Sequence, residues 1–202
     1  TNRTTVSLDA MGGDFAPKTT VEGAVLAAQE LNIATILVGN EPMLAEELSS
    51  YDHAGLPIAI RHASEIITMD ESPLNLIRKK RHSSIRVAFD LVKSGEAQAV
   101  VTAGNSGAAL TASLFVLDNM KGIDRPAIAT AMPTLTGSVI VIDAGANTIC
   151  KPFTLVQFAL MGSVYAQCLL GTENPRVGVL SNGEEDSKGT KLTRESSALL
   201  KD

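Results

Sequence analysis

The chain has 202 residues and a formal net charge of −5, with 45% hydrophobic and 19% charged residues. This composition supports a buried core and excludes a disordered chain. Because the chain is acidic and only 3% of its residues are aromatic, it lacks the basic excess and stacking side chains of general nucleic-acid binders, and no nucleic-acid partner is expected.

Short apolar runs alternate with longer helical patterns along the chain, which is typical of βαβ units and a mostly parallel sheet. The runs predicted as strands are 5–9, 34–39, 58–62, 99–102, 127–131, 139–143 and 177–180. The helical patterns cover 19–31, 42–50, 83–94, 108–117 and 152–172, with a last helix that ends near residue 200. The close spacing of the runs at 127–131 and 139–143 predicts an antiparallel hairpin. We therefore expect a single α/β domain over residues 1–202, with a Rossmann-like sheet in a three-layer sandwich.

The segment 152–172 carries no charged residue over a length that is sufficient to span a bilayer. It includes Gln157, Ser163, Tyr165 and Gln167 and has no sustained run of large aliphatic residues. This polarity favours a helix buried on most sides of a folded protein over a transmembrane helix.

Four loops follow predicted strands, and ligands of open α/β sheets bind at that edge. The first loop contains Asp9, Gly12, Gly13 and Asp14. Its glycines allow backbone amides to approach a ligand, and its carboxylates are candidate site groups. A tight turn with Asp14 as a helix cap explains the same residues about equally well.

The second loop contains Gly104, Asn105, Ser106 and Gly107 just before a predicted helix. Glycine amides, polar side chains and the positive end of the helix together predict an anion site that suits phosphate. The loop has neither a Walker lysine nor the spaced glycines of a dinucleotide site. A structural turn capped by Ser106 is the alternative.

Two further loops carry polar groups at strand ends. Asp143 and Asn147 follow one strand, and Glu184, Glu185 and Lys188 follow the next predicted strand. A lysine near a helix start is suited to neutralise an acyl or phosphoryl oxygen. From these residues alone, a solvated charged loop is the favoured interpretation of the last segment.

The other reactive residues give weaker signals. The basic run 78–81 suits either an acidic partner or a solvated face, and the solvated face is favoured. Cys150 lacks a local catalytic partner in the sequence, so a half-buried thiol is favoured over a nucleophile. Cys150 and Cys168 have no zinc or disulfide pattern, and the histidines have no ligand spacing, so no metal is expected. A reducing, cytoplasmic location without a signal peptide is expected.

Several blocks in order make the sequence similar to the phosphate acyltransferase family of bacterial phospholipid synthesis, the PlsX family. The blocks are Leu-Asp-Ala-Met-Gly-Gly-Asp-Phe-Ala-Pro at 8–17, Arg-Lys-Lys at 78–80, Ala-Gly-Asn-Ser-Gly-Ala at 103–108, Gly-Ile-Asp-Arg-Pro at 122–126, Asp-Ala-Gly-Ala-Asn at 143–147, the run 155–165, Asn-Pro-Arg-Val-Gly at 174–178 and Gly-Glu-Glu at 183–185. The resemblance extends over essentially the whole chain. It implies that these residues form the N-terminal part of a longer catalytic domain, with a fold like that of phosphate acetyltransferases and of isocitrate and isopropylmalate dehydrogenases.

The resemblance implies reversible transfer of a fatty acyl group from acyl carrier protein to inorganic phosphate, which yields acyl phosphate for phosphatidic acid synthesis. It implies no cofactor, a cytoplasmic homodimer that associates peripherally with the membrane, and a membrane acyltransferase as a partner. Lys188 is the expected catalytic residue, and Asn105, Ser106 and Gly107 are expected to bind phosphate at a site oriented by Asp143 and Asn147. The remaining expected substrate-binding residues are Asp9, Gly12, Gly13, Asp14, Gly104, Glu184 and Glu185.

The chain departs from the family pattern at three places, and three alternative functions accompany this interpretation. The family commonly has Leu where Ala144 stands, Asp where Ile149 stands, and Asn-Ile where Ser181-Asn182 stand. Neither Ile149 nor Ser181 is assigned a role. A phosphate acetyltransferase and a nicotinamide-dependent dehydrogenase are alternatives on related folds, although the dinucleotide fingerprint is missing. A noncatalytic protein that binds acyl carrier protein through the basic run is the third alternative.

Overall fold

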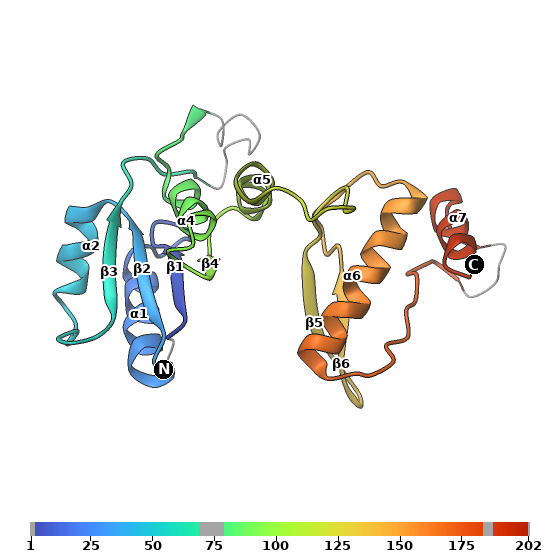
Figure 1. Ribbon diagram of the computed structural model, residues 1–202, viewed down its shortest axis with the longest axis horizontal. Coiled ribbons are helices and arrows are strands. Elements are labelled where there is room, and N and C mark those ends of the chain that lie inside the picture. Colours follow the sequence, from blue (N-terminus) through green and yellow to red (C-terminus); the bar gives the residue numbers. More distant parts are fainter. Residues whose placement is uncertain (1–2, 69–78, 184–187, 202) are drawn as a thin grey trace. The chain divides into compact units, whose positions relative to one another are not determined.

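The computed structural model describes residues 3–68, 79–183 and 188–201, and it divides the chain into two compact units. Unit 1 covers Thr1–Asp118 and unit 2 covers Asn119–Asp202. Figure 1 shows the helices and strands of each unit. The expectation of one continuous domain stays a prediction, and the two units are described separately below.

Unit 1 contains a four-stranded parallel sheet with the strand order β3-β2-β1-β4. Its strands are β1 (Thr5–Asp9), β2 (Ala34–Gly39), β3 (Ile58–His62) and β4 (Ala99–Thr102), each with the predicted bounds. Its helices are α1 (Lys18–Leu31), α2 (Glu41–Leu48), α4 (Ser84–Lys93) and α5 (Ser106–Leu117). The predicted α/β class and the parallel sheet are confirmed.

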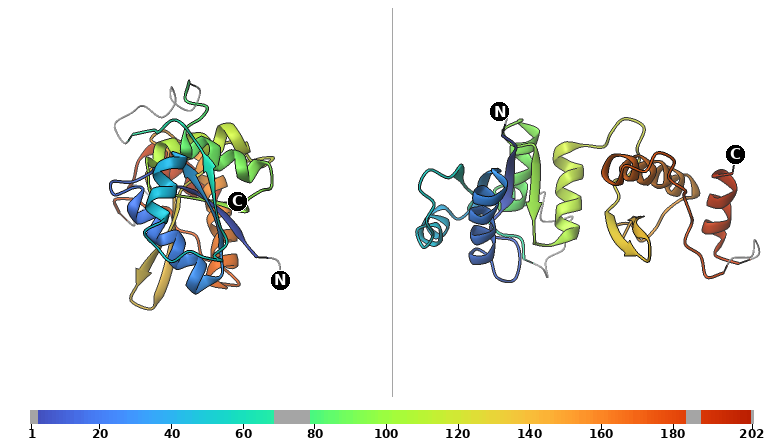
Figure 2. Two further views of the ribbon diagram at one scale, coloured as in Figure 1. Left: turned by 90° about the vertical axis from the view of Figure 1, so that its left-hand side faces the viewer. Right: turned by 90° about the horizontal axis from the view of Figure 1, so that it is seen from below.

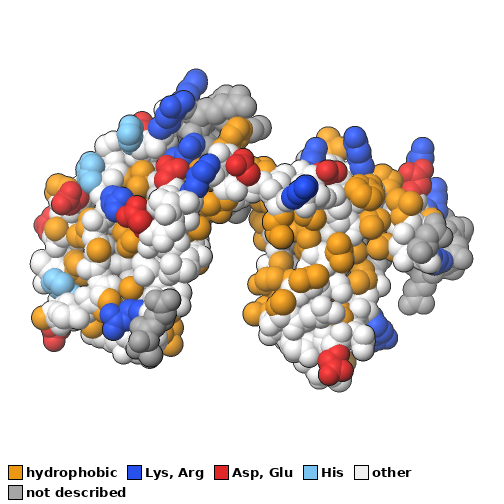
Figure 3. All heavy atoms as spheres, in the orientation of Figure 1, with side chains coloured by type: hydrophobic (Ala, Val, Ile, Leu, Met, Phe, Trp, Pro, Cys, Tyr) orange, Lys and Arg blue, Asp and Glu red, His pale blue; other side chains and the backbone are white. Residues whose placement is uncertain are grey.

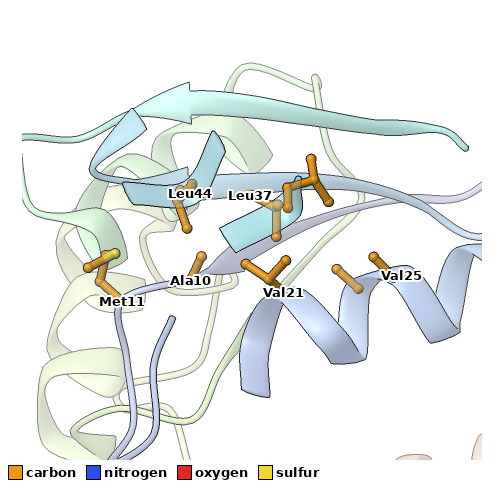
Figure 4. Packing of buried hydrophobic residues seen from close by; sticks show 8 residues of the cluster. Ala10, Met11, Val21, Val25, Leu37 and Leu44 are labelled. Carbon is orange, nitrogen blue, oxygen red and sulfur yellow. The ribbon is translucent and has the colours of Figure 1, made fainter. Parts of the chain in front are cut away.

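Helices cover both faces of this sheet because its strands are apolar on both sides. Leu37 packs with residues of α1 and α2 in one cluster (Figure 4), whereas the next residue, Val38, packs with Ala88 and Leu91 of α4 in another. Successive side chains of a strand point to opposite faces. The right-hand view of Figure 2 shows the resulting three layers, with the sheet of unit 1 between two layers of helices.

The described part of unit 2 contains an antiparallel hairpin and two helices. The hairpin pairs β5 (Ala129–Thr134) with β6 (Gly137–Ile142), and the helices are α6 (Pro152–Leu170) and α7 (Lys191–Leu199). Thr134 is paired with Gly137, so the turn has two residues and is shorter than the predicted connection. The predicted hairpin is confirmed, with β5 extending through Pro133.

The predicted strand at 177–180 is wrong, since no strand is found there among the described residues. Val177 and Leu180 are 50% and 85% exposed. A run of this composition becomes a strand only when a neighbouring strand supplies ladder hydrogen bonds. The described part of unit 2 pairs β6 only with β5.

The expectation that helix 152–172 is buried on most sides is also wrong for the described chain. Helix α6 has 19 residues, a mean hydropathy of 1.5 over its most apolar stretch, and 28% of that stretch buried. It contacts β6 and α7, and it leaves large apolar residues such as Leu160 and Val164 at least half exposed. Figure 3 shows apolar side chains gathered on unit 2. In length and composition α6 is sufficient to cross a membrane, and it is the one described helix of which this holds.

Candidate functional site

The carboxyl ends of β1 and β4 meet at one edge of the sheet in unit 1. The two strands are adjacent and parallel, and Asp9 is paired with Thr102, the last residue of β4. The Thr102 hydroxyl donates a hydrogen bond to Asp9 Oδ2 over 2.8 Å. The Gly104 amide donates to Thr102 Oγ1 over 3.0 Å. The predicted loops after β1 and β4 are therefore brought together, and Thr102 connects them.

Gly12 and Gly104 allow the two loops to touch. A Cβ atom at Gly12 would lie 2.6 Å from Asp9 Oδ2 and 3.0 Å from both Gly104 N and Thr102 Oγ1. A Cβ atom at Gly104 would lie 3.2 Å from the Gly12 Cα atom. Close packing therefore opposes a side chain at Gly12, and a side chain at Gly104 would require its neighbours to shift slightly. Gly13, in contrast, has a φ of +109°, which L side chains rarely adopt.

The Asp9 side chain is almost completely enclosed, with 3% of the residue exposed. Burial raises the pKa of Asp9, although the nearby Ser84 hydroxyl, the Thr102 hydroxyl and the Met11 amide lower it. Its Oδ1 atom has no hydrogen-bond partner among the described residues. A buried carboxyl oxygen without a donor is costly to ionise. Asp9 therefore lies beneath the loops as a buried acid, which distinguishes it from the exposed Asp14.

The N-terminus of α5 lies directly after Gly104. The Asn105 side chain accepts a hydrogen bond from Ala108 N over 3.0 Å and is the N-cap of α5. The helix therefore begins at Ser106, two residues earlier than predicted, and the alternative with Ser106 as the cap is wrong. The first amides of a helix have no partner within it. Ser106 and Gly107 thus present N–H groups at the positive end of α5, which is a suitable place for an anion.

Asp14 does not cap the first helix, so that alternative interpretation of the first loop is also wrong. Helix α1 begins after Pro17, and no side chain provides its N-cap hydrogen bond. Asp14 is exposed at the end of the Gly12-Gly13 turn. Its role in binding substrate stays a prediction.

In unit 2, Asp143 and Asn147 stabilise their own loop. Asp143 has a φ of +64°, and its Oδ1 atom accepts from Asn147 N over 3.1 Å and from Asn147 Nδ2 over 2.9 Å. Asn147 Nδ2 also donates to the Pro126 carbonyl. The predicted pair is therefore in direct contact, and its hydrogen bonds hold the segment that leads into α6.

Cys150 lies beside this pair, with its Sγ atom 3.9 Å from Asp143 Oδ2. Burial raises the pKa of the Cys150 thiol, Asp143 raises it further, and Arg125 acts in the opposite direction. A thiol with a raised pKa is a poor nucleophile near neutral pH. These surroundings favour the interpretation of Cys150 as a half-buried, unreactive thiol.

Lys188 is exposed in unit 2, near the start of α7. The neighbouring loop is held by a hydrogen bond from Gly189 N to Asn182 Oδ1 over 2.9 Å, and the Thr190 side chain caps α7. Glu184 and Glu185 lie outside the described residues. The predicted site residues thus belong to both units, and the roles of those in unit 2 stay predictions.

The basic run is described from Lys79 onward, whereas Arg78 lies outside the described residues. Lys80 Nζ donates to the Ile66 carbonyl over 2.8 Å, and Lys79 and Arg81 are exposed. Within the described chain, no group of three or more histidine, cysteine or acidic residues could hold a metal ion.

Sequence reasoning missed Thr102, which is the residue that joins the two loops. The sequence contains a pattern that could have identified Thr102, because Asp9 and Thr102 both end predicted strands and both precede glycine-rich loops. Recognising it required the strand order, which places β4 directly beside β1.

Residues 4–202 match the sequence model of the fatty acid synthesis protein family. The chain belongs to this family. Among curated relatives, the chain is 59% identical over 196 residues to proteins named phosphate acyltransferase from Geobacter sulfurreducens and Geotalea uraniireducens. In both cases the match covers 97% of this chain and 57% of the relative. The chain thus spans little more than half the length of these relatives.

Two solved structures share the fold of this chain. The EutD phosphotransacetylase from Staphylococcus aureus has a TM-score of 0.63, with coverage of 98% of this chain and 64% of that chain. A phosphotransacetylase from Streptococcus pyogenes has a TM-score of 0.71, with coverage of 99% and 66%. Both are 16% identical in sequence, so they establish the fold alone. The predicted resemblance to the phosphate acetyltransferase fold is confirmed.

Proposed function

We propose that this protein transfers a fatty acyl group from acyl carrier protein to inorganic phosphate and releases acyl phosphate for phospholipid synthesis. The identity of 59% to proteins named phosphate acyltransferase carries this proposal. The α5 N-terminus supports it, because Ser106 and Gly107 direct backbone amides to a place suited to phosphate.

The reaction needs a bound phosphate and a stabilised oxyanion. A phosphate oxygen attacks the thioester carbonyl carbon, a C–O bond forms, and the carbonyl oxygen becomes negatively charged. The intermediate then collapses, the C–S bond breaks, and the carrier thiolate leaves and takes up a proton. This sequence consumes no redox equivalent. The reaction requires positive groups near the phosphate and near the carbonyl oxygen. We propose that the α5 amides and Lys188 are these groups.

The proposal extends to the partners and the location. Acyl carrier proteins are acidic, so the exposed Lys79 and Arg81 are suited to contact the donor. We further propose a cytoplasmic homodimer that associates peripherally with the membrane and passes its product to a membrane acyltransferase. The family and the exposed apolar residues of unit 2 support this extension.

The test uses the full-length protein with acyl carrier protein loaded with a fatty acid, and it follows phosphate-dependent release of the carrier thiol. Lys188→Ala is expected to lower acyl phosphate formation by about 100-fold, because a charged group that stabilises a developing oxyanion contributes on this scale. Lys191→Ala is the matched control, since Lys191 is 85% exposed and pairs with Glu195 on the surface of α7. Near-normal turnover of Lys188→Ala would remove Lys188 from the mechanism.

A second candidate is transfer of a short acyl group to phosphate, which the fold shared with phosphotransacetylases favours. The same assay separates the two candidates when the fatty acyl donor is replaced with an acetyl donor. Phosphate-dependent turnover with only the acetyl donor would support the second candidate and contradict the first.

A further inference from the structure

The Thr102 hydroxyl connects a buried acid to the loop that precedes α5. It donates its hydrogen to Asp9 Oδ2 over 2.8 Å and accepts from Gly104 N over 3.0 Å. A hydroxyl group has one hydrogen and two lone pairs. With its hydrogen donated to Asp9 Oδ2, the Thr102 oxygen still has lone pairs that accept from the Gly104 amide. The hydroxyl group therefore joins the acid to the loop through two hydrogen bonds.

Gly104 lies close in sequence to the amides that are proposed to bind phosphate. It directly precedes the N-cap Asn105, which is followed by Ser106 and Gly107. The Asn105 side chain is itself held by its bond to Ala108 N. The start of α5 is therefore fixed from both sides, by the cap within the helix and by the Thr102 bond in front of it.

Packing alone does not explain why a carboxyl group is buried at the end of β1. Asp9 is 3% exposed, and its Oδ1 atom has no hydrogen-bond partner among the described residues. A strand end that needed only to be filled would be more stable with an apolar side chain, because a buried polar atom without a partner is destabilising. Retaining a carboxyl group here is understandable if its hydrogen bond to Thr102 serves the loop above it.

We propose that Thr102, held by Asp9, is a positioning residue that sets the Gly104 amide and thereby the Ser106 and Gly107 amides for phosphate. The proposal rests on the proposed function, in which those two amides bind the phosphate substrate. It assigns Asp9 and Thr102 an action through the loop, without contact between either side chain and the reacting atoms.

The test compares Thr102→Val with Thr102→Ser in the full-length protein. Valine preserves the shape but removes the hydroxyl, whereas serine keeps a donor and acceptor at the same place. We expect Thr102→Val to raise the KM for inorganic phosphate about tenfold, which is the effect of losing one hydrogen bond that orders the site. The KM for the acyl donor should be unchanged, and Thr102→Ser should restore most of the phosphate KM.

Thr35→Val is the control, because Thr35 is also a strand threonine, lies in β2 and is buried, so that removing its hydroxyl makes the same chemical change away from the loop. It should leave the KM for phosphate unchanged. If Thr102→Val leaves the phosphate KM unchanged, or if it impairs both substrates equally and serine gives no rescue, the proposal is overturned. Both results would reduce Thr102 to an ordinary packing residue.

A binding measurement covers the case in which Thr102→Val does not fold. Inorganic phosphate is titrated into wild-type protein and Thr102→Ser while backbone amide resonances are followed. The proposal expects the Ser106 and Gly107 signals to move in both proteins with affinities within about threefold. Unmoved signals at these amides overturn it. Because this readout needs no turnover, wild-type protein that binds phosphate there but makes no acyl phosphate would contradict the proposed function alone.

Discussion

Gly12 illustrates how one missing side chain allows two loops to approach each other. A Cβ atom would lie 2.6 Å from Asp9 Oδ2 and 3.0 Å from Gly104 N. We expect Gly12→Ala to lower the free energy of unfolding by about 1–3 kcal/mol, since overpacking forces the loops apart. Gly23→Ala is the control, because nothing lies within 4 Å of its added Cβ in α1. It should stabilise by about 0.5–1 kcal/mol. Urea denaturation measures both, and equal stability of the two variants would contradict the prediction.

The raised pKa of Asp9 predicts how stability depends on pH. Folded protein holds this proton more tightly than unfolded protein, since burial raises the pKa above its ordinary value of 3.8. The stabilisation is fully present below the unfolded pKa and is lost as pH rises through the folded pKa. The stability of wild type relative to Asp9→Asn should therefore fall as pH increases above 3.8. Chemical denaturation at a series of pH values measures this difference.

Glu96 provides a control of opposite sign. The hydrogen bond from Arg61 lowers the pKa of this exposed carboxyl group, and the Ser94 hydroxyl assists. Its contribution is present above the unfolded pKa and is lost as pH falls through the folded pKa. Wild type relative to Glu96→Gln should gain a small amount of stability with rising pH. If the stability difference between wild type and Asp9→Asn changes with pH in the same direction as that between wild type and Glu96→Gln, Asp9 does not have a raised pKa.

Helices α5 and α2 both begin with an asparagine cap, so replacing the two caps distinguishes an effect on stability from an effect on phosphate binding. Asn105 caps α5 through Ala108 N, and Asn40 caps α2 through Met43 N. Replacing either residue with alanine should lower the free energy of unfolding by about 1 kcal/mol. Only Asn105→Ala should also weaken binding of inorganic phosphate, because α2 has proline in its first turn and one amide fewer to offer. Equal loss of phosphate affinity in both variants would contradict an anion site at α5.

The elements of unit 1 were predictable because each strand has its own apolar run and each helix has a continuous segment between strands or loops, which is amphipathic in α4 and made of small and apolar residues in α5. β1, β2, β3 and β4 have the predicted bounds. The start of α5 was less predictable, since both Asn105 and Ser106 are good cap residues and only the bond to Ala108 N decides between them.

The elements of unit 2 were less predictable because their environment depends on partners that a single sequence does not reveal. The run at 177–180 has strand composition, but a strand also needs a neighbour with which to exchange hydrogen bonds. Helix α6 is apolar almost throughout, and only its contacts show that Phe158 is buried whereas Phe153 is 59% exposed. The contact between Asp9 and Thr102 in the candidate site was also not predictable, because it depends on the strand order, which places β4 beside β1.

At the scale of the whole molecule, the buried apolar residues are divided very unequally between the two units. All three hydrophobic clusters of the described residues lie in unit 1. The described part of unit 2 contributes Phe158, Ala159 and Ala166 to the buried apolar residues. Since burial of apolar surface is the main favourable contribution to folding, the two units should differ strongly in their ability to fold alone.

This difference predicts the behaviour of two fragments. Residues 1–118 should unfold in one cooperative transition on heating, because their sheet and its helices enclose complete clusters. Residues 119–202 should show no cooperative transition, because their apolar residues are mostly exposed in the described part of the unit. Circular dichroism of the separate fragments during heating measures both. In the fragment 1–118, Leu37→Ala should lower the transition temperature, because it removes a fully buried side chain. A sharp transition in the fragment 119–202 would show that the hairpin, α6 and α7 are sufficient to form a stable core.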